Sequence, residues 1–280
     1  MWTARVARSP VDFFLADRSL KAWVTAISST ASSESAWAVL GTVGLAYKEG
    51  LSAIWFMPGC LFGYLVNWLF IAERLRKHSE ENQAITLPDY FENHFDDKSH
   101  VLRMISVVII FSCMMAYVAA QFTAIGKTFD AIFGIPHIIS ISVGGAIVLV
   151  YTMMGGVRAV AWTDFAQGII MVLGLVILSG VALASLGGFS GMIAEVGKAS
   201  PETLQWMGEK STAAFLGSTV GLLGIGLGYP GQPHVVTRYM AAKNTETIEK
   251  GTWIALGWGL MVYSSSIVLG ICGQALFPGL

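Results

Sequence analysis

Long apolar runs alternate with short polar segments along this 280-residue chain. Residues 51–72, 104–126 and 165–193 contain no Asp, Glu, Lys or Arg, and each run exceeds the roughly 20 residues that an α-helix needs to cross a bilayer. The pattern predicts an all-α polytopic membrane protein with about seven membrane-spanning helices. These spans run roughly over 22–47, 50–72, 104–126, 137–155, 162–186, 213–241 and 252–277.

Composition agrees with a chain whose main partner is the lipid bilayer. Charged residues make up 12% of it, against about 25% in soluble domains. A net charge of −1 offers no basic surface for nucleic acid. Cys60, Cys113 and Cys272 lie singly within apolar spans, which indicates small core side chains and no metal site. The motifs HExxH and GxSxG do not occur, and we do not expect an enzyme.

Lysine and arginine are distributed unevenly between the two sides of the predicted bundle. With the N-terminus in the cytoplasm, thirteen of the 17 fall on cytoplasmic segments and four on outside segments. Basic residues collect on the cytoplasmic side of membrane proteins, so we expect a bacterial inner (plasma) membrane protein with this orientation. The polar segment 73–103 is then cytoplasmic and is expected to hold a short interfacial helix over 87–94, whereas the loop 195–211 lies outside.

Two spans have sequences that disfavour one continuous helix. Residues 28–35 carry six hydroxyl side chains and Glu34, and residues 221–233 hold five glycines and two prolines. Proline removes a backbone donor, and unwound backbone at membrane depth persists only where protein or a watery cavity satisfies its polar groups. Two such breaks five spans apart are typical of an inverted-repeat transporter with its binding site at the breaks. Close helix packing through small residues is the competing interpretation.

This pattern predicts a single transporter domain over residues 1–280. Its first repeat covers about 22–190, and its second begins within about 212–280.

Four polar residues in or beside the spans need an explanation. Glu34 falls near the middle of the first span, where an ionisable group is functional by default, although a structural carboxylate bonded to nearby hydroxyls is the alternative. Asp164 follows Thr163 at a predicted helix start, which favours an N-cap over an ion site. His234 is expected to be a hydrogen-bonded core histidine. Arg238 is expected to be a cytoplasmic anchor.

Four ordered motifs resemble those of the sodium:solute symporters. They are residues 12–20 (DFFLADRSL), residues 86–91 (TLPDYF) with 95–99 (FDDKS), the GG and AVAWTD sequences within 155–167, and residues 226–234 (GLGYPGQPH) with Arg238 and Met240. The last motif is similar to the sodium/proline branch. The resemblance implies a leucine-transporter-type fold of two inverted five-helix repeats. Relative to that fold an N-terminal helix and the last three helices of the second repeat are missing, so the sequence resembles a fragment.

The resemblance also implies a binding site. In that family backbone carbonyls at the first break help to bind sodium, which by motif places sodium at Ala31 and Glu34. Carbonyl oxygens suit a hard cation whatever the side chain. No other metal and no organic cofactor is expected. The expected substrate-binding residues, around the two breaks, are Ser33, Ser35, Trp37, Ile225, Tyr229, Gln232 and Pro233.

At three of these positions the chain departs from the proline-transporting members of the family. Those members carry Asp where Ser33 stands, Met where Glu34 stands and Trp where Ile225 stands. The carboxylate has therefore moved by one position, about 100° around a helix, and an aromatic wall is lost. The implied substrate widens from proline to a small amino acid or a related organic solute.

The resemblance therefore implies secondary active transport, in which sodium entry drives solute uptake by alternating access. The membrane potential supplies about 2.3 kcal/mol per charge per 100 mV. Two alternatives stay open. A solute sensor built on a symporter domain would carry a soluble signalling extension, and a proton-coupled symporter would use Glu34. The sequence also leaves the oligomeric state open.

Overall fold

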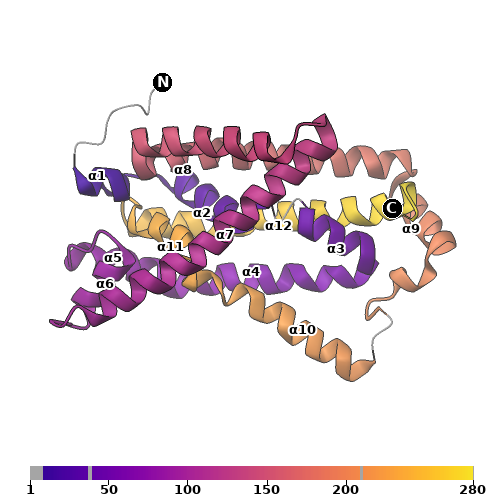
Figure 1. Cartoon of the computed structure of the whole chain (residues 1–280). Coiled ribbons are helices and arrows are strands. Elements are labelled where there is room, and N and C mark those ends of the chain that lie inside the picture. Colours follow the sequence, from indigo (N-terminus) through magenta and orange to yellow (C-terminus); the bar gives the residue numbers. More distant parts are fainter. Residues whose placement is uncertain (1–8, 37–39, 209–210, 280) are drawn as a thin grey trace.

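The computed structural model describes residues 9–36, 40–208 and 211–279, and most of these residues are helical (Figure 1). The α-helices are α1 (Pro10–Leu15), α2 (Ala22–Ala36), α3 (Thr42–Glu49), α4 (Phe56–Val66), α5 (Glu73–Glu81), α6 (Leu87–His94), α7 (Val101–Phe133), α8 (His137–Ser185), α9 (Gly188–Ala199), α10 (Thr212–Gly226), α11 (Pro233–Met240) and α12 (Thr245–Leu276). Shorter helical turns are η1 (Ala16–Arg18), η3 (Gly50–Trp55), η4 (Asn67–Ala72), η5 (Pro201–Leu204) and η6 (Tyr229–Gly231). The all-α fold class is confirmed.

Five continuous helical stretches of the described chain are long and apolar enough to cross a membrane, over 42–81, 101–133, 137–185, 212–231 and 245–276. The stretch 137–185 is α8, which folds at Gly156 into the two spans predicted over 137–155 and 162–186. Its arms lie along the upper edge of Figure 1. The first predicted span corresponds to α2 and α3, and residues 37–39 between them lie outside the described part.

The fold in α8 requires glycine. Gly156 has φ +54°, a conformation that strains residues with a β-carbon. A β-carbon there would also lie 2.4 Å from the carbonyl oxygen of Phe13 in α1. The bend therefore seats the N-terminal helix against α8.

The serine-rich stretch 28–35 is helical, so the prediction of a break within it is wrong. Its hydroxyls bond back to the helix: Ser29 and Thr30 donate to the carbonyl of Ala26 at 3.0 and 2.7 Å, and Ser33 donates to Thr30 at 2.7 Å. Such bonds satisfy a hydroxyl inside an apolar bundle without unwinding the backbone. Helix α2 continues to Ala36, the last described residue before the gap.

The second predicted break is confirmed. Helix α10 ends at Gly226, the turn η6 follows, and Gln232 is extended (φ −95°, ψ 105°) before α11 begins at Pro233. Neither Pro230 nor Pro233 can donate a backbone hydrogen bond, and proline is well accommodated at the first position of a new helix. The local sequence therefore ends one helix and starts another within the span.

Helices α4 and α10 cross at glycines. A β-carbon built on Gly63 would lie 2.2 Å from the α-carbon of Gly226, and one on Gly59 would lie 2.3 Å from the carbonyl oxygen of Leu222. Small residues four apart allow membrane helices to approach this closely. The contact fixes the end of α10, and with it the start of the break, against α4.

The core lies where α2, α4, α11 and α12 meet. Phe56, Tyr64, Trp68, Tyr239 and Tyr263 are each no more than 2% exposed. Trp68 and Tyr239 pack edge to face with ring centroids 4.7 Å apart, a favoured arrangement for aromatic pairs.

Helix α6 coincides with the short helix predicted over 87–94, and Thr86 and Asp89 form a capping box at its start.

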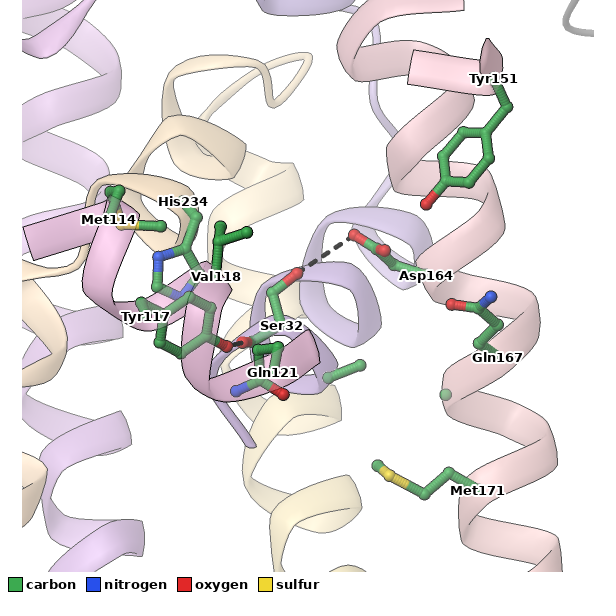
Figure 2. Close-up of a pocket in the computed structure, with 12 residues that line it drawn as sticks. Ser32, Met114, Tyr117, Val118, Gln121, Tyr151, Asp164, Gln167, Met171 and His234 are labelled. Carbon is green, nitrogen blue, oxygen red and sulfur yellow. Dashed lines mark hydrogen bonds between the residues drawn. The ribbon is translucent and has the colours of Figure 1, made fainter. Parts of the chain in front are cut away.

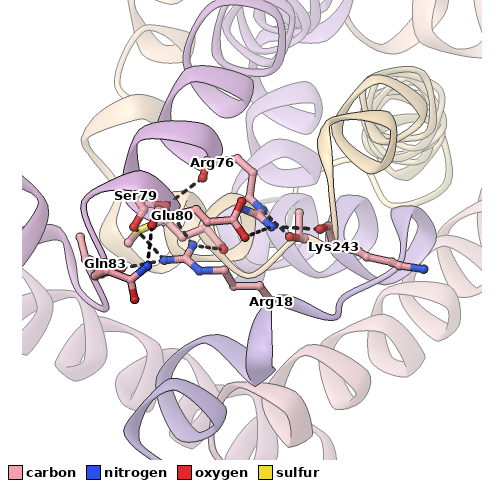
Figure 3. Close-up of polar contacts among 9 residues, drawn as sticks. Arg18, Arg76, Ser79, Glu80, Gln83 and Lys243 are labelled. Carbon is pink, nitrogen blue, oxygen red and sulfur yellow. Dashed lines mark hydrogen bonds and ion pairs between the residues drawn. The ribbon is translucent and has the colours of Figure 1, made fainter.

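Residues 240–243, the last residue of α11 and the three that follow it toward α12, are held through their backbone (Figure 3), and we term this segment the connector. Arg18 donates to the carbonyl of Met240 at 2.8 Å. The amide of Leu20 donates to Ala241 at 3.1 Å. Arg76, which is 3% exposed, donates to the carbonyls of Ala242 and Lys243 at 2.5 and 2.9 Å. Four consecutive carbonyls of the connector thus accept hydrogen bonds from the segment before α2 and from α5.

Candidate functional site

Glu34 lies in the last turn of α2, and its side chain is 1% exposed. Tyr64 on α4 donates its hydroxyl proton to Glu34 Oε1 at 2.5 Å. The other oxygen, Oε2, is buried and has no hydrogen-bond partner among the described residues. A bare carboxylate inside a membrane protein is costly. The free oxygen is therefore a position where a cation, a proton or a donor group is favoured.

Three tyrosines from separate elements meet beside Glu34, and we term them the tyrosine cluster: Tyr64, Tyr229 of η6 and Tyr263 of α12. The hydroxyls of Tyr229 and Tyr263 are 3.1 Å apart, and those of Tyr64 and Tyr263 are 3.5 Å apart. The rings of Tyr64 and Tyr229 pack with centroids 4.7 Å apart. Ser33 Oγ lies 3.0 Å from the Tyr64 hydroxyl. A row of hydroxyls thus links the end of α2 to the break between α10 and α11.

A cavity of about 410 Å³ lies at another face of α2, bounded also by α7, α8 and α11 (Figure 2). Ala31 and Ser32 form its α2 wall. Ser32 and Glu34 are two residues apart, about 200° around the helix, so the cavity and the tyrosine cluster lie on different faces of α2. The other polar residues that line the cavity are Tyr117, Gln121, Tyr151, Asp164, Gln167 and His234.

Asp164 and Arg238 form an ion pair at the edge of this cavity, with Nη2 and Oδ2 2.6 Å apart. Ser28 and Ser32, one turn apart on α2, donate to the same Oδ2 at 2.8 and 3.1 Å. Arg238 Nε donates to Ser28 Oγ at 3.0 Å. The two charged side chains are 17% and 10% exposed. Oδ2 therefore accepts from three donors that come from two different helices.

Two of the three predictions about single polar residues at this site are wrong, those for Asp164 and His234. Asp164 lies inside the second arm of α8, so it is no N-cap. Arg238 is buried in the ion pair, and its role as a cytoplasmic anchor stays a prediction. His234 is only partly buried and faces the cavity, where its ring stacks on Tyr117 with centroids 5.1 Å apart.

The remaining predicted residues are spread along the second break and the first span. Ile225 is 44% exposed on α10. Gln232 has its Oε1 buried without a hydrogen-bond partner among the described residues. Pro233 lines a separate, mostly apolar cavity. Trp37 and the side chain of Ser35 lie outside the described part of the chain.

The structure thus brings Ser33, Glu34 and Tyr229 together and places Ala31 in the wall of the neighbouring cavity. Sequence reasoning missed Tyr64 and Tyr263, which complete the cluster. Their signal was present, because a tyrosine hydroxyl within an apolar span has to find a polar partner.

Comparison with known proteins shows relatives along almost the whole chain. The sodium/proline symporter of Escherichia coli (strain K12) is 35% identical over 267 residues, which are 95% of this chain and 52% of the relative. The high-affinity proline transporter PutP of Bacillus subtilis (strain 168) is 33% identical over 267 residues, 95% of this chain and 56% of the relative. The chain spans about half the length of these relatives.

A solved structure shares the fold. It is a Na⁺-coupled sialic acid symporter in a substrate-bound, outward-open state. It superimposes with a TM-score of 0.82 at 18% identity, over 99% of this chain and 57% of that one. The sequence model of one family also matches residues 13–279, a range that includes both α2 and the broken helix. The chain belongs to the sodium:solute symporter family.

Proposed function

We propose that this chain is part of a sodium-coupled symporter for a small amino acid or a related organic solute. The observation that carries the proposal is the broken span from α10 to α11, where Tyr229 meets Ser33 and Glu34 through the tyrosine cluster. Polar groups gathered at an interrupted helix inside an apolar bundle are typical of a transport site. The names of the proline-transporting relatives make proline the first solute to test.

Sodium is proposed to bind at the end of α2, near Ala31 and Glu34. The fit rests on oxygen chemistry. Glu34 Oε2 is buried and unpartnered among the described residues, and the hydroxyls of Ser33 and Tyr64 lie beside the same carboxylate. Sodium is a hard cation, and oxygen ligands suit hard cations. Backbone carbonyls of the same turn are proposed to complete this half of the site.

The solute is proposed to bind between α2 and the second break. Tyr229 is the best supported of the substrate-binding residues, because its hydroxyl joins the cluster at Glu34 through Tyr263. Ser33, Ser35, Trp37, Ile225, Gln232 and Pro233 remain proposed from the resemblance. Movement of the chain at the break would shift Tyr229 relative to Tyr64. Solute binding at the break would therefore change the contacts within the tyrosine cluster.

The proposed orientation in the inner membrane keeps the N-terminus cytoplasmic. In Figure 1, helices α1, α5, α6 and α11 lie at the same end of the bundle, and α9 lies at the opposite end. The first end carries Arg18, Arg76 and Arg158, and α9 carries Lys198. This asymmetry fits the preference of basic residues for the cytoplasmic face.

The test is uptake of labelled proline, and then of other small amino acids, by the full-length protein in proteoliposomes. We expect accumulation when sodium is imposed outside and little accumulation without it. Accumulation that follows an imposed pH gradient and ignores sodium would favour the proton-coupled alternative. Solute binding without accumulation under either gradient would favour the sensor.

A further inference from the structure

The Asp164–Arg238 ion pair joins parts of the chain that the two expected repeats keep separate. Asp164 is on the second arm of α8, and its partners Ser28 and Ser32 are on α2, both within the first expected repeat. Arg238 is on α11, after the break in the second expected repeat. Among the ion pairs in which both residues belong to the described part of the chain, this one connects the two expected repeats.

Each of the three guanidinium nitrogens of Arg238 donates a hydrogen bond in this arrangement. Nη2 donates to Asp164, Nε donates to Ser28, and Nη1 donates to the carbonyl of His234. A planar guanidinium held by several acceptors is a specific, directional contact. It also occupies Asp164 Oδ2 at 2.6 Å, and a sodium ion on that oxygen would be repelled by the guanidinium at this distance.

The pair is poorly exposed, so it favours one arrangement of the helices strongly over others. Separating buried partners leaves an uncompensated charge in a medium of low dielectric constant. Alternating access in inverted-repeat transporters proceeds by rocking one part of the bundle against the other. A buried pair between helices that move relative to each other has to break, and a pair that stays intact makes its helices move together.

We propose that Asp164 and Arg238 are positioning residues that form a latch, holding α11 against α2 and α8 in the conformation described here. The inference rests on the proposed function. Opening the latch frees α11 to move from α2 and exposes the packed surface beside Asp164. The latch acts through helix position, and neither residue needs to touch the solute or the sodium ion.

The test uses a reporter thiol beside the latch. Ala161 is fully buried one turn before Asp164 on α8, so Ala161→Cys in the purified full-length protein without native cysteines reports opening there. Asp164→Asn and Arg238→Gln should each raise the rate of thiol modification by about tenfold or more, because each breaks a buried pair. The double variant should react no faster than the faster single variant, since all three lose the same link.

Two further variants keep the test decisive. Arg158→Gln is the matched control, because Arg158 is on α8 like Asp164 but pairs with Asp12 of α1 at 3.0 Å, and it should leave the rate unchanged. Ser28→Ala removes the hydroxyl that bridges the pair without leaving a charge unpaired, so it should give a smaller rise even if the charge variants fold poorly. A correctly folded Ser28→Ala protein with an unchanged rate would count against the latch.

Unchanged modification rates in Asp164→Asn and Arg238→Gln would overturn the proposal. It would also be overturned if the fold-increase in rate of the double variant equalled the product of the two single fold-increases. A sodium effect on the rate that Asp164→Asn abolishes and Arg238→Gln retains would identify Asp164 as an ion ligand and overturn it as well. These rates are measured without solute. A parent protein that fails to accumulate solute would contradict the proposed function separately.

Discussion

Replacing Gly63 by alanine tests the close crossing of α4 and α10. The added β-carbon would lie 2.2 Å from the α-carbon of Gly226 and 2.3 Å from its carbonyl atoms, whereas ordinary contacts begin at 3.4 Å. Every one of these neighbours is backbone, so no side-chain rotation relieves the overlap. The two helices must therefore separate by roughly 1.2 Å at this point.

The expected cost follows from that displacement. Overpacking a well-packed interior costs about 1–3 kcal/mol, and we expect the upper half of that range because backbone opposes the new methyl group. The better helix propensity of alanine returns about 0.5–1 kcal/mol. The net loss is about 1–2.5 kcal/mol, which lowers the melting temperature by several degrees.

The same displacement should impair transport. Gly226 is the last residue of α10, and Tyr229 follows three residues later with its ring packed on Tyr64. Pushing α10 away from α4 moves Tyr229 out of the tyrosine cluster. Solute uptake by Gly63→Ala should therefore fall even at temperatures where the protein stays folded.

Melting of the full-length protein in detergent, together with sodium-driven uptake, measures both effects. Gly224→Ala is the matched control, because it lies on α10 and a β-carbon there meets nothing within 4 Å. We expect this control to melt at the parent temperature or slightly above it. If Gly63→Ala and Gly224→Ala melt at the same temperature, the close crossing of α4 and α10 does not exist in the protein.

Three further predictions concern ion coupling, the connector and orientation. Glu34→Gln should raise the sodium concentration for half-maximal uptake about tenfold or more, roughly 1.4 kcal/mol, whereas a flattened pH dependence with unchanged sodium dependence would indicate a proton site instead. Arg76→Ala should destabilise the protein by about 2–4 kcal/mol by leaving two connector carbonyls unpaired. Lys77→Ala, which removes only an exposed ion pair on the same helix, is its control, and equal melting of the two would contradict the prediction. In intact cells, a cysteine placed at Glu202 should react with an impermeant thiol reagent and one placed at Lys98 should not; the reverse pattern would overturn the orientation.

The second break could be predicted from sequence because its causes are local. Pro230 and Pro233 cannot donate backbone hydrogen bonds wherever the chain places them. The same holds for α6, whose capping residues Thr86 and Asp89 lie three apart in sequence. Long apolar runs likewise fix most of the spans without any knowledge of their neighbours.

The serine-rich stretch and the ion pair depend on contacts between distant segments. Residues 28–35 are helical because their hydroxyls find acceptors within α2 and on Asp164, which is 136 residues away from Ser28. Arg238 lies 74 residues after Asp164, and a basic residue near the end of a span is otherwise typical of a cytoplasmic anchor. Only the packed structure shows which charged residues face each other.

The connector of residues 240–243 is held by hydrogen bonds to its backbone carbonyls. These bonds constrain the number of residues in the connector and do not depend on its side chains. Successive carbonyls of a chain in extended or turn conformation point in different directions. Each donor from Arg18, Leu20 and Arg76 is therefore matched to one peptide unit in order. Inserting or deleting one residue would place every donor opposite the wrong peptide unit, while exchanging small side chains would leave all four acceptors in place. Members of this family should accordingly tolerate substitutions in the connector far better than changes in its length.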